Sequence, residues 1–296
     1  MFNLCIGRFF SHIFIIFLSG QILFSLFFSC PAVAQEKRKP FAFAVSAMIS
    51  PAVTFQHFTE FRDYLATKLE RPVVMKQRRT YAEINELLSR KEVSMAFTCT
   101  GGFLAGRRSF GLEALAVPVV DGVTTYQSFI IVPEGHPAKQ IADLRGSVFA
   151  FTDPLSLTGR IYPTAVINSM GFKTGDFFKK TFFTASHDKS ISAVAEGVAD
   201  AAAIDSLIFN SLMRAPGSAA HQVKVIHSSP PFGMPPIVVS PELDKEEKRT
   251  LLKILLGMSS DPKGEILLQA LETDGFAIPD PSMYRSALML IQQMTE

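Results

Sequence analysis

A short polar loop carries the strongest chemical signal in the sequence. It reads Asp153-Pro154-Leu155-Ser156-Leu157-Thr158-Gly159 and follows an apolar stretch from Val148 to Phe151. The pattern predicts a buried strand, the loop, and a helix over Gly159–Met170. The start of a helix presents unpaired backbone N–H groups and a partial positive charge, and Ser156 and Thr158 add hydroxyl donors. The segment therefore offers what an anion needs, although an ordinary Ser or Thr helix cap has the same residue types.

A histidine and an aspartate follow two later strands. His187 lies just before a predicted helix over Ser190–Glu196, and Asp205 follows a predicted strand over Ala201–Ile204. Asp205 could cap a helix that begins at the next residue, or it could accept a proton-bearing group of a ligand, and the two roles are compatible. An anion beside His187 would favour the protonated imidazole, so the sequence predicts tighter binding at mildly acidic pH.

Two tyrosines and a threonine complete the candidate set. Tyr81 and Tyr126 can reach an anion with phenolic O–H donors while their rings wall a cleft, although a Tyr on an amphipathic element is usually part of a core rim. Thr98 begins a predicted polar loop, Thr98–Gly102, after a short buried strand over Val93–Phe97. Cys99 in that loop is interpreted as a small buried filler and not as a nucleophile, because no His is next to it.

Predicted strands alternate with amphipathic helices along most of the chain, which favours an α/β fold. The first strand, Phe41–Ala47, precedes a helix with apolar residues at helical spacing from Phe55 to Leu69. Thr80 and Glu83 form a predicted capping box for a helix that ends near Arg90. Beyond residue 240 we expect helices alone, over residues 241–259, 263–273 and 282–294.

Two apolar segments, Tyr126–Val132 and Pro235–Ser240, are predicted to cross between domains. The chain between them has its own series of strands and helices. This order predicts a first domain from residues 41–125 plus 236–296, and an inserted second domain from residues 126–235. Ligands of open α/β sheets bind outside the carboxyl ends of the strands, so we expect a ligand cleft between the two domains.

The motifs along the chain resemble those of the phosphate/phosphite/phosphonate-binding proteins of ABC importers. The loop at residues 153–159 is similar to that family's Asp-Pro-x-Ser-Thr-Ser-Gly loop and differs from it by Leu157 and by Thr158, a Ser/Thr exchange. Similar motifs occur before and after it in the family's order: Thr80-Tyr81-Ala82, Tyr126-Gln127-Ser128, Ser186-His187-Asp188, Ala203-Ile204-Asp205-Ser206 and Ser229-Pro230-Pro231-Phe232-Gly233. The resemblance covers nearly all of residues 41–296.

The resemblance implies the fold of a type II periplasmic binding protein, with two α/β domains joined by two crossover strands and a ligand cleft between them. It implies capture of a phosphonate, phosphite or phosphate anion for an ABC permease in the inner membrane, with no catalysis, no metal and no cofactor. The implied ligand-binding residues are Tyr81, Thr98, Tyr126, Ser156, Leu157, Thr158, His187 and Asp205. Leu157 stands where the family commonly has a hydroxyl, and Thr98 stands where some members have an aromatic residue.

The amino terminus predicts export to the periplasm. Arg8 is the one charged residue before an apolar run, Phe9–Phe28, and small residues then lead to Ala32-Val33-Ala34. This is the pattern of a secretory signal with cleavage after Ala34, while an uncleaved anchor or lipidation at Cys30 are the alternatives. Cleavage would leave 262 of the 296 residues, enough for two domains, with 28 basic and 27 acidic residues and no sign of a nucleic-acid partner.

Three functions are weighed on this fold. The first is transport, by a monomeric binding protein that delivers its ligand to the permease. The second is sensing by a membrane-tethered domain, which an uncleaved Phe9–Phe28 segment would favour. The third is catalysis, but the sequence lacks a defensible Ser/His/Asp, metal or paired-carboxylate grouping. After cleavage Cys99 would be the only cysteine, which excludes a disulfide framework, and the few His and Cys residues argue against zinc.

Overall fold

The computed structural model, which describes residues 39–46 and 51–294, contains two mixed β-sheets. The expected signal segment lies outside the described residues. The first sheet has the order β13-β4-β12-β3-β1-β2, in which β1 runs parallel to β2 and β3 while β12 and β13 are antiparallel to their neighbours. Its strands are β1 (Phe41–Ser46), β2 (Val73–Arg78), β3 (Met95–Phe97), β4 (Glu113–Val119), β12 (Ile237–Val239) and β13 (Gly275–Ala277).

Helices cover both faces of the first sheet. Successive side chains of a strand point to opposite faces, so Phe43 and Val45 join one apolar cluster and Ala44 joins the other. The first cluster packs against α2 (Pro51–Leu69), α9 (Lys245–Leu256) and α10 (Pro262–Ala270). The second packs against α3 (Tyr81–Ser89) and α4 (Thr100–Phe110). This sheet and its helices are the first domain.

The second sheet has the order β10-β6-β9-β7-β8, with β7 parallel to β8 and β9. Its strands are β6 (Ser128–Pro133), β7 (Val148–Phe151), β8 (Lys180–Phe183), β9 (Ala201–Asp205) and β10 (Val223–Ser228). One face carries α5 (Tyr162–Ser169) and α6 (Thr174–Phe177), and the other carries α7 (His187–Ala195) and α8 (Ser206–Arg214). This sheet and its helices are the second domain.

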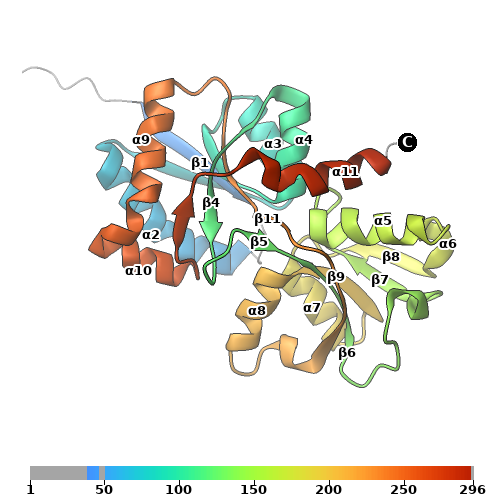
Figure 1. The fold of residues 1–296 in the computed structure, drawn as a ribbon. Helices are drawn as coiled ribbons and strands as arrows, with labels where there is room; N and C mark the ends of the chain where they lie inside the picture. The colour runs from blue at the N-terminus through green and yellow to red at the C-terminus, as the bar shows by residue number, and fades with distance from the viewer. Residues whose placement is uncertain (1–38, 47–50, 295–296) are drawn as a thin grey trace, which may run out of the picture. The chain divides into compact units, whose positions relative to one another are not determined.

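Two short strands lie where the chain passes between the sheets. β5 (Thr125–Tyr126) pairs antiparallel with β11 (Phe232–Gly233), so the two crossings run side by side (Figure 1). The carboxyl-terminal helix α11 (Arg285–Gln293) contacts α4 of the first domain and α5 of the second. The predicted fold class is confirmed, with two α/β domains, two crossings and helices on both faces of each sheet. The domain boundaries at residues 125/126 and 235/236 stay a prediction.

The predicted site residues lie at the carboxyl ends of parallel strands. Thr98 follows β3, the loop at residues 153–159 follows β7, and Asp205 ends β9. Parallel strands present their carboxyl ends at one edge of a sheet. The two edges meet, because the Tyr81 amide of the first domain donates to the Asp153 carboxylate of the second at 3.3 Å.

Several element predictions were wrong. The predicted polar loop Thr98–Gly102 contains the start of a helix, Thr100–Phe110, whose glycines are explained by its close approach to the second domain. His187 does not precede the next helix but is its first residue. The end of the chain is not purely helical, because it contains β13. The pattern did not predict this strand, which pairs with β4. In contrast, the capping box of Thr80 and Glu83 is confirmed.

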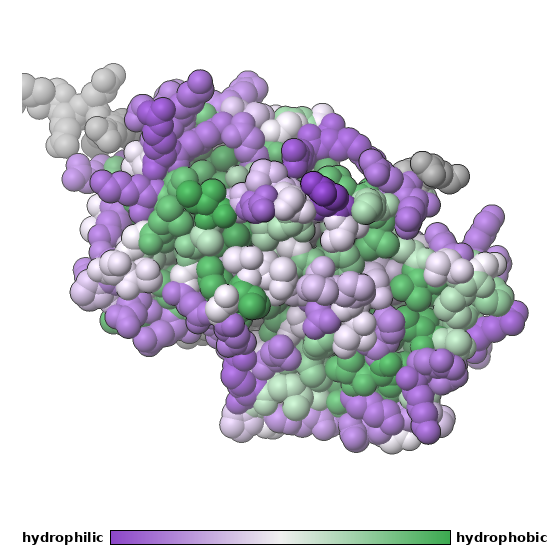
Figure 2. Space-filling view, in the orientation of Figure 1, coloured by the Kyte–Doolittle hydropathy of each residue, from purple (hydrophilic) through white to green (hydrophobic). Residues whose placement is uncertain are grey.

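The surface offers no broad apolar area on the face that Figure 2 shows, where hydrophobic patches are interrupted by hydrophilic side chains. The large apolar side chains that remain exposed come from both domains, among them Val123, Val198 and Ile266. Scattered exposed apolar residues are normal in monomeric proteins and by themselves indicate no partner. Among the described residues, no helix combines the length and apolar character needed to cross a membrane.

Candidate functional site

The loop after β7 is shaped by the carboxylate of Asp153. One of its oxygens accepts a hydrogen bond from the Leu155 amide at 2.7 Å, and the other accepts from the Tyr81 amide at 3.3 Å. Burial raises the pKa of the Asp153 carboxyl above its usual value, and the two amides offset part of that shift. Asp153 therefore orders the loop and also ties it to the N-terminus of α3.

Ser156 caps the helix that follows the loop. Its hydroxyl accepts a hydrogen bond from the Gly159 amide at 3.0 Å. The first turn of this helix is a π-turn over Leu157–Ile161, which continues directly into α5. A hydroxyl that accepts from an amide keeps its own O–H to donate. Ser156 can therefore cap the helix and bind an anion at the same time, so the two interpretations of this residue do not compete.

Gly159 is required by packing inside the second domain. A Cβ at this position would overlap the side chain of Thr152. The Thr152 hydroxyl in turn donates to the Ala203 carbonyl of β9 at 3.1 Å and lies 3.3 Å from Nδ1 of His187. The absence of a side chain at Gly159 thus lets the start of the helix approach the residues around the histidine.

His187 and Asp205 form a buried pair at the ends of β8 and β9. Nε2 of His187 lies 3.2 Å from Oδ2 of Asp205, and the two side chains are only 1% and 2% exposed. Oδ1 of Asp205 accepts from the Ile208 amide at 2.7 Å, which makes Asp205 the N-cap of α8. The predicted capping role of Asp205 is confirmed, and its contact with a ligand stays a prediction.

The backbone fixes the tautomer of His187. The Asp205 amide donates to Nδ1 of the ring at 3.1 Å. An amide N–H can only donate, so Nδ1 must present a lone pair, and the proton of the neutral ring is then on Nε2, facing the Asp205 carboxylate. A second proton on Nδ1 would point at the amide hydrogen. The expected tighter binding at mildly acidic pH stays a prediction.

Several buried hydroxyls of the candidate site have no hydrogen-bond partner among the described residues. Within the described part of the chain, the hydroxyls of Tyr81, Thr98, Tyr126 and Ser186 have no hydrogen-bond partner. All four residues are at most 3% exposed. Each such hydroxyl loses about 1–3 kcal/mol of hydrogen bonding on burial, so a cluster of them needs an explanation. A ligand that accepts hydrogen bonds would satisfy them.

These hydroxyls belong to different parts of the chain, and Tyr81 and Tyr126 lie near each other. A Cβ added to Gly102 would lie 2.8 Å from Oγ1 of Thr98 and 3.1 Å from Cβ of Tyr81, so these two residues meet at the start of α4. Tyr126 is on β5, where the chain enters the second domain. Ser186 is the residue before His187, and it brings the fourth hydroxyl from the second domain. The donors therefore approach the site from both domains.

The two phenols are held neutral. Burial raises the pKa of Tyr81 and of Tyr126, and the nearby carboxylate of Asp205 raises both further. Thr100 lies beside the Tyr126 hydroxyl, and its own hydroxyl donates to a backbone carbonyl of β11 at 2.9 Å. Both tyrosines therefore keep their proton and can act as hydrogen-bond donors.

Leu157 and Thr158 contribute mainly through packing and backbone. The Leu157 side chain is fully buried in an apolar cluster with Phe103 of the first domain, and its amide lies against the Cys99 sulfur. The Thr158 carbonyl accepts from the Ser128 hydroxyl at 2.7 Å, which holds the helix start against β6. Leu157 thus packs between the two domains. The sequence predicted a backbone contact with a ligand for this residue, but not this packing role.

Cys99 joins the domains from the N-terminus of α4. Its sulfur accepts from the Gly102 amide at 3.1 Å, and its thiol donates to the Leu155 carbonyl at 3.5 Å. Burial raises the pKa of the thiol, so it stays protonated and remains a donor. Its interpretation as a buried, unreactive residue agrees with this environment, while its contact with the second domain was not predicted.

Ser186 is the site residue that sequence reasoning missed. It occupies the N-cap position of α7, yet its hydroxyl makes no capping hydrogen bond. A Ser at the start of a helix is normally interpreted as a cap, so the residue type gave no signal by itself. The signal that could have found it is its position in the motif Ser186-His187-Asp188. Among the described residues, no group of three or more His, Cys, Asp or Glu side chains could hold a metal ion.

Comparison with solved structures gives the same fold at low sequence identity. A binding protein component of an ABC phosphonate transporter from Pseudomonas aeruginosa superposes with a TM-score of 0.80 at 20% identity, over 86% of this chain and 87% of the other. PhnD1 from Prochlorococcus marinus, solved in complex with methylphosphonate, superposes with a TM-score of 0.79 at 17% identity, over 87% of this chain and 98% of the other. The aliphatic sulphonate binding protein SsuA from Escherichia coli gives 0.58 at 14% identity, over 86% and 93%.

The family comparison covers most of the chain. Residues 43–284 match the profile of the phosphonate periplasmic substrate-binding proteins of ABC transporters. This span contains both sheets, both crossings and every site residue described above. The chain therefore belongs to the family of periplasmic phosphonate-binding proteins of ABC transporters.

Proposed function

We propose that this protein captures a phosphonate, phosphite or phosphate anion between its two domains and presents it to an ABC permease in the inner membrane. The observation that carries the proposal is the set of buried hydroxyls without a partner among the described residues, Tyr81, Thr98, Tyr126 and Ser186. A tetrahedral oxyanion has acceptors in several directions and could satisfy them together. PhnD1 from Prochlorococcus marinus, of the same fold, was solved with methylphosphonate.

The proposed ligand would meet donors on one side and an acceptor on the other. Ser156 and the amides of the following helix add donors to the four hydroxyls, and the helix start favours negative charge. Asp205 is a carboxylate, which repels an anion but accepts from an acidic O–H. Its two oxygens already accept from His187 and Ile208, yet each retains a second lone pair. A phosphorus anion that carries a proton is therefore favoured over sulfate, which carries none.

Closure of the domains around the ligand would produce the surface that a permease recognises. Tyr81 with Asp153 and Cys99 with Leu155 already make contacts across the two domains. The alternative of a sensing domain uses the same cleft, but the family is one of ABC transporters and supports transport. Whether the amino-terminal segment is cleaved or retained stays a prediction that sequencing of the exported protein would answer.

We also propose that the site binds without catalysis. Cys99 is kept as a thiol by burial, so it is not the nucleophile of this site. Nδ1 of His187 accepts from a backbone amide, and Nε2 faces the Asp205 carboxylate. Neither ring nitrogen is paired with a free hydroxyl in the way that a nucleophile and its general base are.

Isothermal titration calorimetry tests the proposal directly. We expect binding of at least one of phosphate, phosphite, methylphosphonate and aminoethylphosphonate, and no binding of sulfate. Tyr126→Phe should weaken binding by about tenfold to a hundredfold, the loss of one hydrogen bond to a charged partner. Tyr64→Phe, on α2 and away from the cluster, is the matched control and should bind as the parent does. A folded protein that binds none of the phosphorus anions would overturn the proposal.

A further inference from the structure

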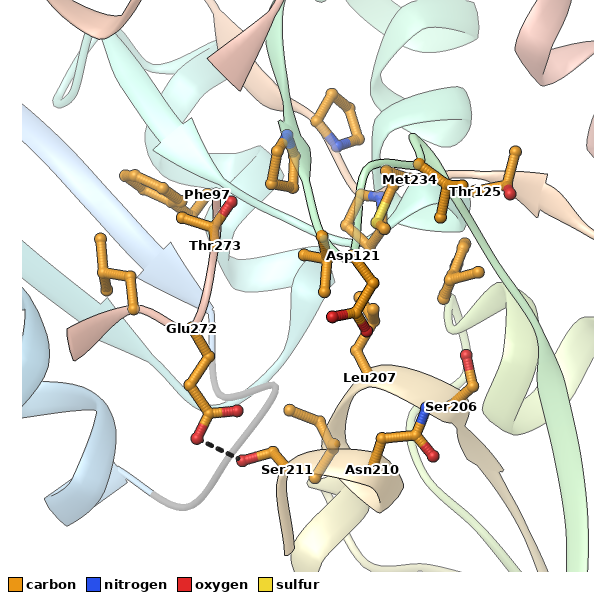
Figure 3. Close-up of a pocket in the computed structure, with 18 of the residues that line it drawn as sticks. Phe97, Asp121, Thr125, Ser206, Leu207, Asn210, Ser211, Met234, Glu272 and Thr273 are labelled. Atoms are coloured by element: carbon orange, nitrogen blue, oxygen red, sulfur yellow. Dashed lines mark hydrogen bonds between the residues drawn. The ribbon is translucent and has the colours of Figure 1, made fainter. Parts of the chain in front are cut away.

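A cavity of about 650 Å³ adjoins the anion cluster. Thr98 and Tyr126, two of the residues with unsatisfied hydroxyls, are part of its wall. Asp188 and Ser206, next in sequence to His187 and Asp205, are also part of the wall. Figure 3 shows that Leu207 and Asn210 of α8 face Phe97 and Asp121 of the first domain across this space. The cavity therefore continues outward from the proposed anion site.

The walls of the cavity are mainly apolar. They include aromatic and aliphatic side chains from both domains, among them Phe97, Phe129, Leu207, Met234, Ile237 and Phe276. The charged residues Asp121, Arg214 and Glu272 also line it, but these three are exposed to solvent. Glu272 is engaged by the Ser211 hydroxyl at 3.0 Å and by Arg214. These three lie toward solvent, whereas one oxygen of Asp188 and the hydroxyls of Thr98 and Tyr126 are buried polar groups of a wall that is otherwise mainly apolar.

The size of the cavity exceeds what a bare anion needs. Cavities of about 300–1,000 Å³ with apolar walls and a few placed polar groups hold ligands with a substantial organic part. Phosphate, phosphite or methylphosphonate would fill the hydroxyl cluster and leave the apolar walls in contact with water. An apolar substituent on phosphorus would replace that water while the anion keeps its donors.

We propose that the preferred ligand is a phosphonate that carries an apolar alkyl or aryl group, with its anionic head at the hydroxyl cluster and its substituent in this cavity. The inference rests on the proposed function, because the head group is the phosphorus oxyanion. The carboxylate of Asp188 restricts the substituent further. One of its oxygens is buried and has no partner among the described residues, so a second negative charge on the substituent would be repelled.

A homologous series of ligands tests the inference on the purified full chain. Calorimetry with methyl-, butyl-, hexyl- and phenylphosphonate should show affinity rising by about threefold to fourfold for each methylene until the cavity is filled. Hexylphosphonate has five more methylenes and should then bind roughly 200-fold to 1,000-fold more tightly than methylphosphonate. Hexyl phosphate separates a preference for the phosphonate from a preference for the substituent alone. If hexyl phosphate binds more tightly than hexylphosphonate, the ligand is a phosphate ester and the phosphonate assignment is wrong.

Two variants separate the cavity from the anion cluster. Leu207→Asn and Val123→Asn each place a polar group on the wall, and Val123 is 50% exposed, so its replacement does not threaten folding. Both variants should bind hexylphosphonate about fivefold more weakly, or weaker still, because buried apolar contact is lost. Their affinity for methylphosphonate should not change. Val198→Asn, at a 59% exposed position outside the cavity wall, is the matched control and should change the affinity for neither ligand.

The outcomes distinguish this inference from the proposed function. Tight binding of methylphosphonate or phosphate with affinity that falls as the chain lengthens would overturn the inference and leave the proposed function intact. Tighter binding of aminoethylphosphonate than of hexylphosphonate would also overturn it, and would assign the unpartnered oxygen of Asp188 to an ammonium group. Failure of every phosphorus anion to bind would overturn both.

Discussion

At the scale of single residues, the site is built from side chains that already have one structural task. Asp205 caps α8 with one oxygen and holds His187 with the other. Ser156 caps the helix after the loop and keeps its O–H free to donate. Asp153 orders its loop and touches the first domain. Such double use keeps the groups rigid, so a ligand would find its partners already oriented.

The first prediction at this scale concerns the proton of His187. Because the Asp205 amide donates to Nδ1, the neutral ring should carry its proton on Nε2. Long-range ¹H–¹⁵N correlation NMR of the ring nitrogens reads this tautomer directly. A neutral ring with its proton on Nδ1 would show that the amide contact does not govern the tautomer.

The second prediction concerns Asp153 and the free energy of unfolding. Burial raises the pKa of this carboxyl in the folded state, so the folded protein holds its proton to higher pH than the unfolded chain does. The stability that this proton contributes is fully present below the usual Asp pKa of about 4 and is lost as the pH rises through the raised value.

Urea unfolding of the parent and of Asp153→Asn from pH 4 to 7 measures this effect. The parent should lose stability relative to the variant as the pH rises, because the amide of the variant does not titrate. The substitution also alters the hydrogen bonds to Leu155 and Tyr81. That change shifts the free energy of unfolding by a constant amount and leaves its slope against pH unaffected. Parallel curves would mean that the two amides fully compensate the burial of the carboxylate.

At the scale of elements, α4 is the helix whose start, within Thr98–Gly102, sequence reasoning assigned to a polar loop. Its first turn contains Gly101 and Gly102, which are poor helix formers, so the pattern read as irregular. The structure gives the reason for both glycines. A Cβ on Gly101 would overlap the Leu155 carbonyl oxygen of the second domain, and a Cβ on Gly102 would crowd Thr98 and Tyr81. The two glycines lower the helix propensity of this turn, and they allow its close contact with the loop at residues 153–159.

Gly101→Ala should therefore weaken ligand binding more than it weakens the fold. The added methyl group overlaps an atom of the other domain, and overpacking of this kind costs about 1–3 kcal/mol, or roughly fivefold to a hundredfold in affinity if the domains move apart to relieve it. Small-angle scattering should show a more open molecule. Gly175→Ala on α6 is the matched control, because nothing lies near its added Cβ. An unchanged affinity for Gly101→Ala would mean that the loop shifts instead of the domain.

At the scale of the whole described molecule, contacts between the domains occur on more than one side of the cavity. Asp153 and Cys99 make them beside the anion cluster, and Glu272 makes another with Ser211 and Arg214 of α8 (Figure 3). Glu272 has a positive φ of 51°, which holds its side chain at the end of α10 toward α8. These contacts join the two domains of the described structure at separate places.

Glu272→Gln tests how much this exposed contact adds to closure. Exposed ion pairs contribute about 0–1 kcal/mol, so affinity should fall by no more than about fivefold and the effect should shrink at high salt. Glu86→Gln removes a similarly exposed ion pair with Arg90 inside α3 and is the matched control. Calorimetry at low and high salt measures both. Equal effects of the two substitutions would show that the contact across the domains has no special part in closure.

Local sequence determined most of the strands and helices of this protein and several of the helix caps. Alternating strands and helices, the capping box of Thr80 and Glu83, and Asp205 as a helix cap follow from neighbours in the chain, so their physics is local and readable. Tertiary structure decided what those neighbours cannot show. The tautomer of His187, the hydroxyls left without partners and the contact of Cys99 with Leu155 depend on residues that are far apart in sequence. Sequence spacing names the groups that can bind an anion, but only the packing of two domains decides which of them remain unsatisfied and therefore available.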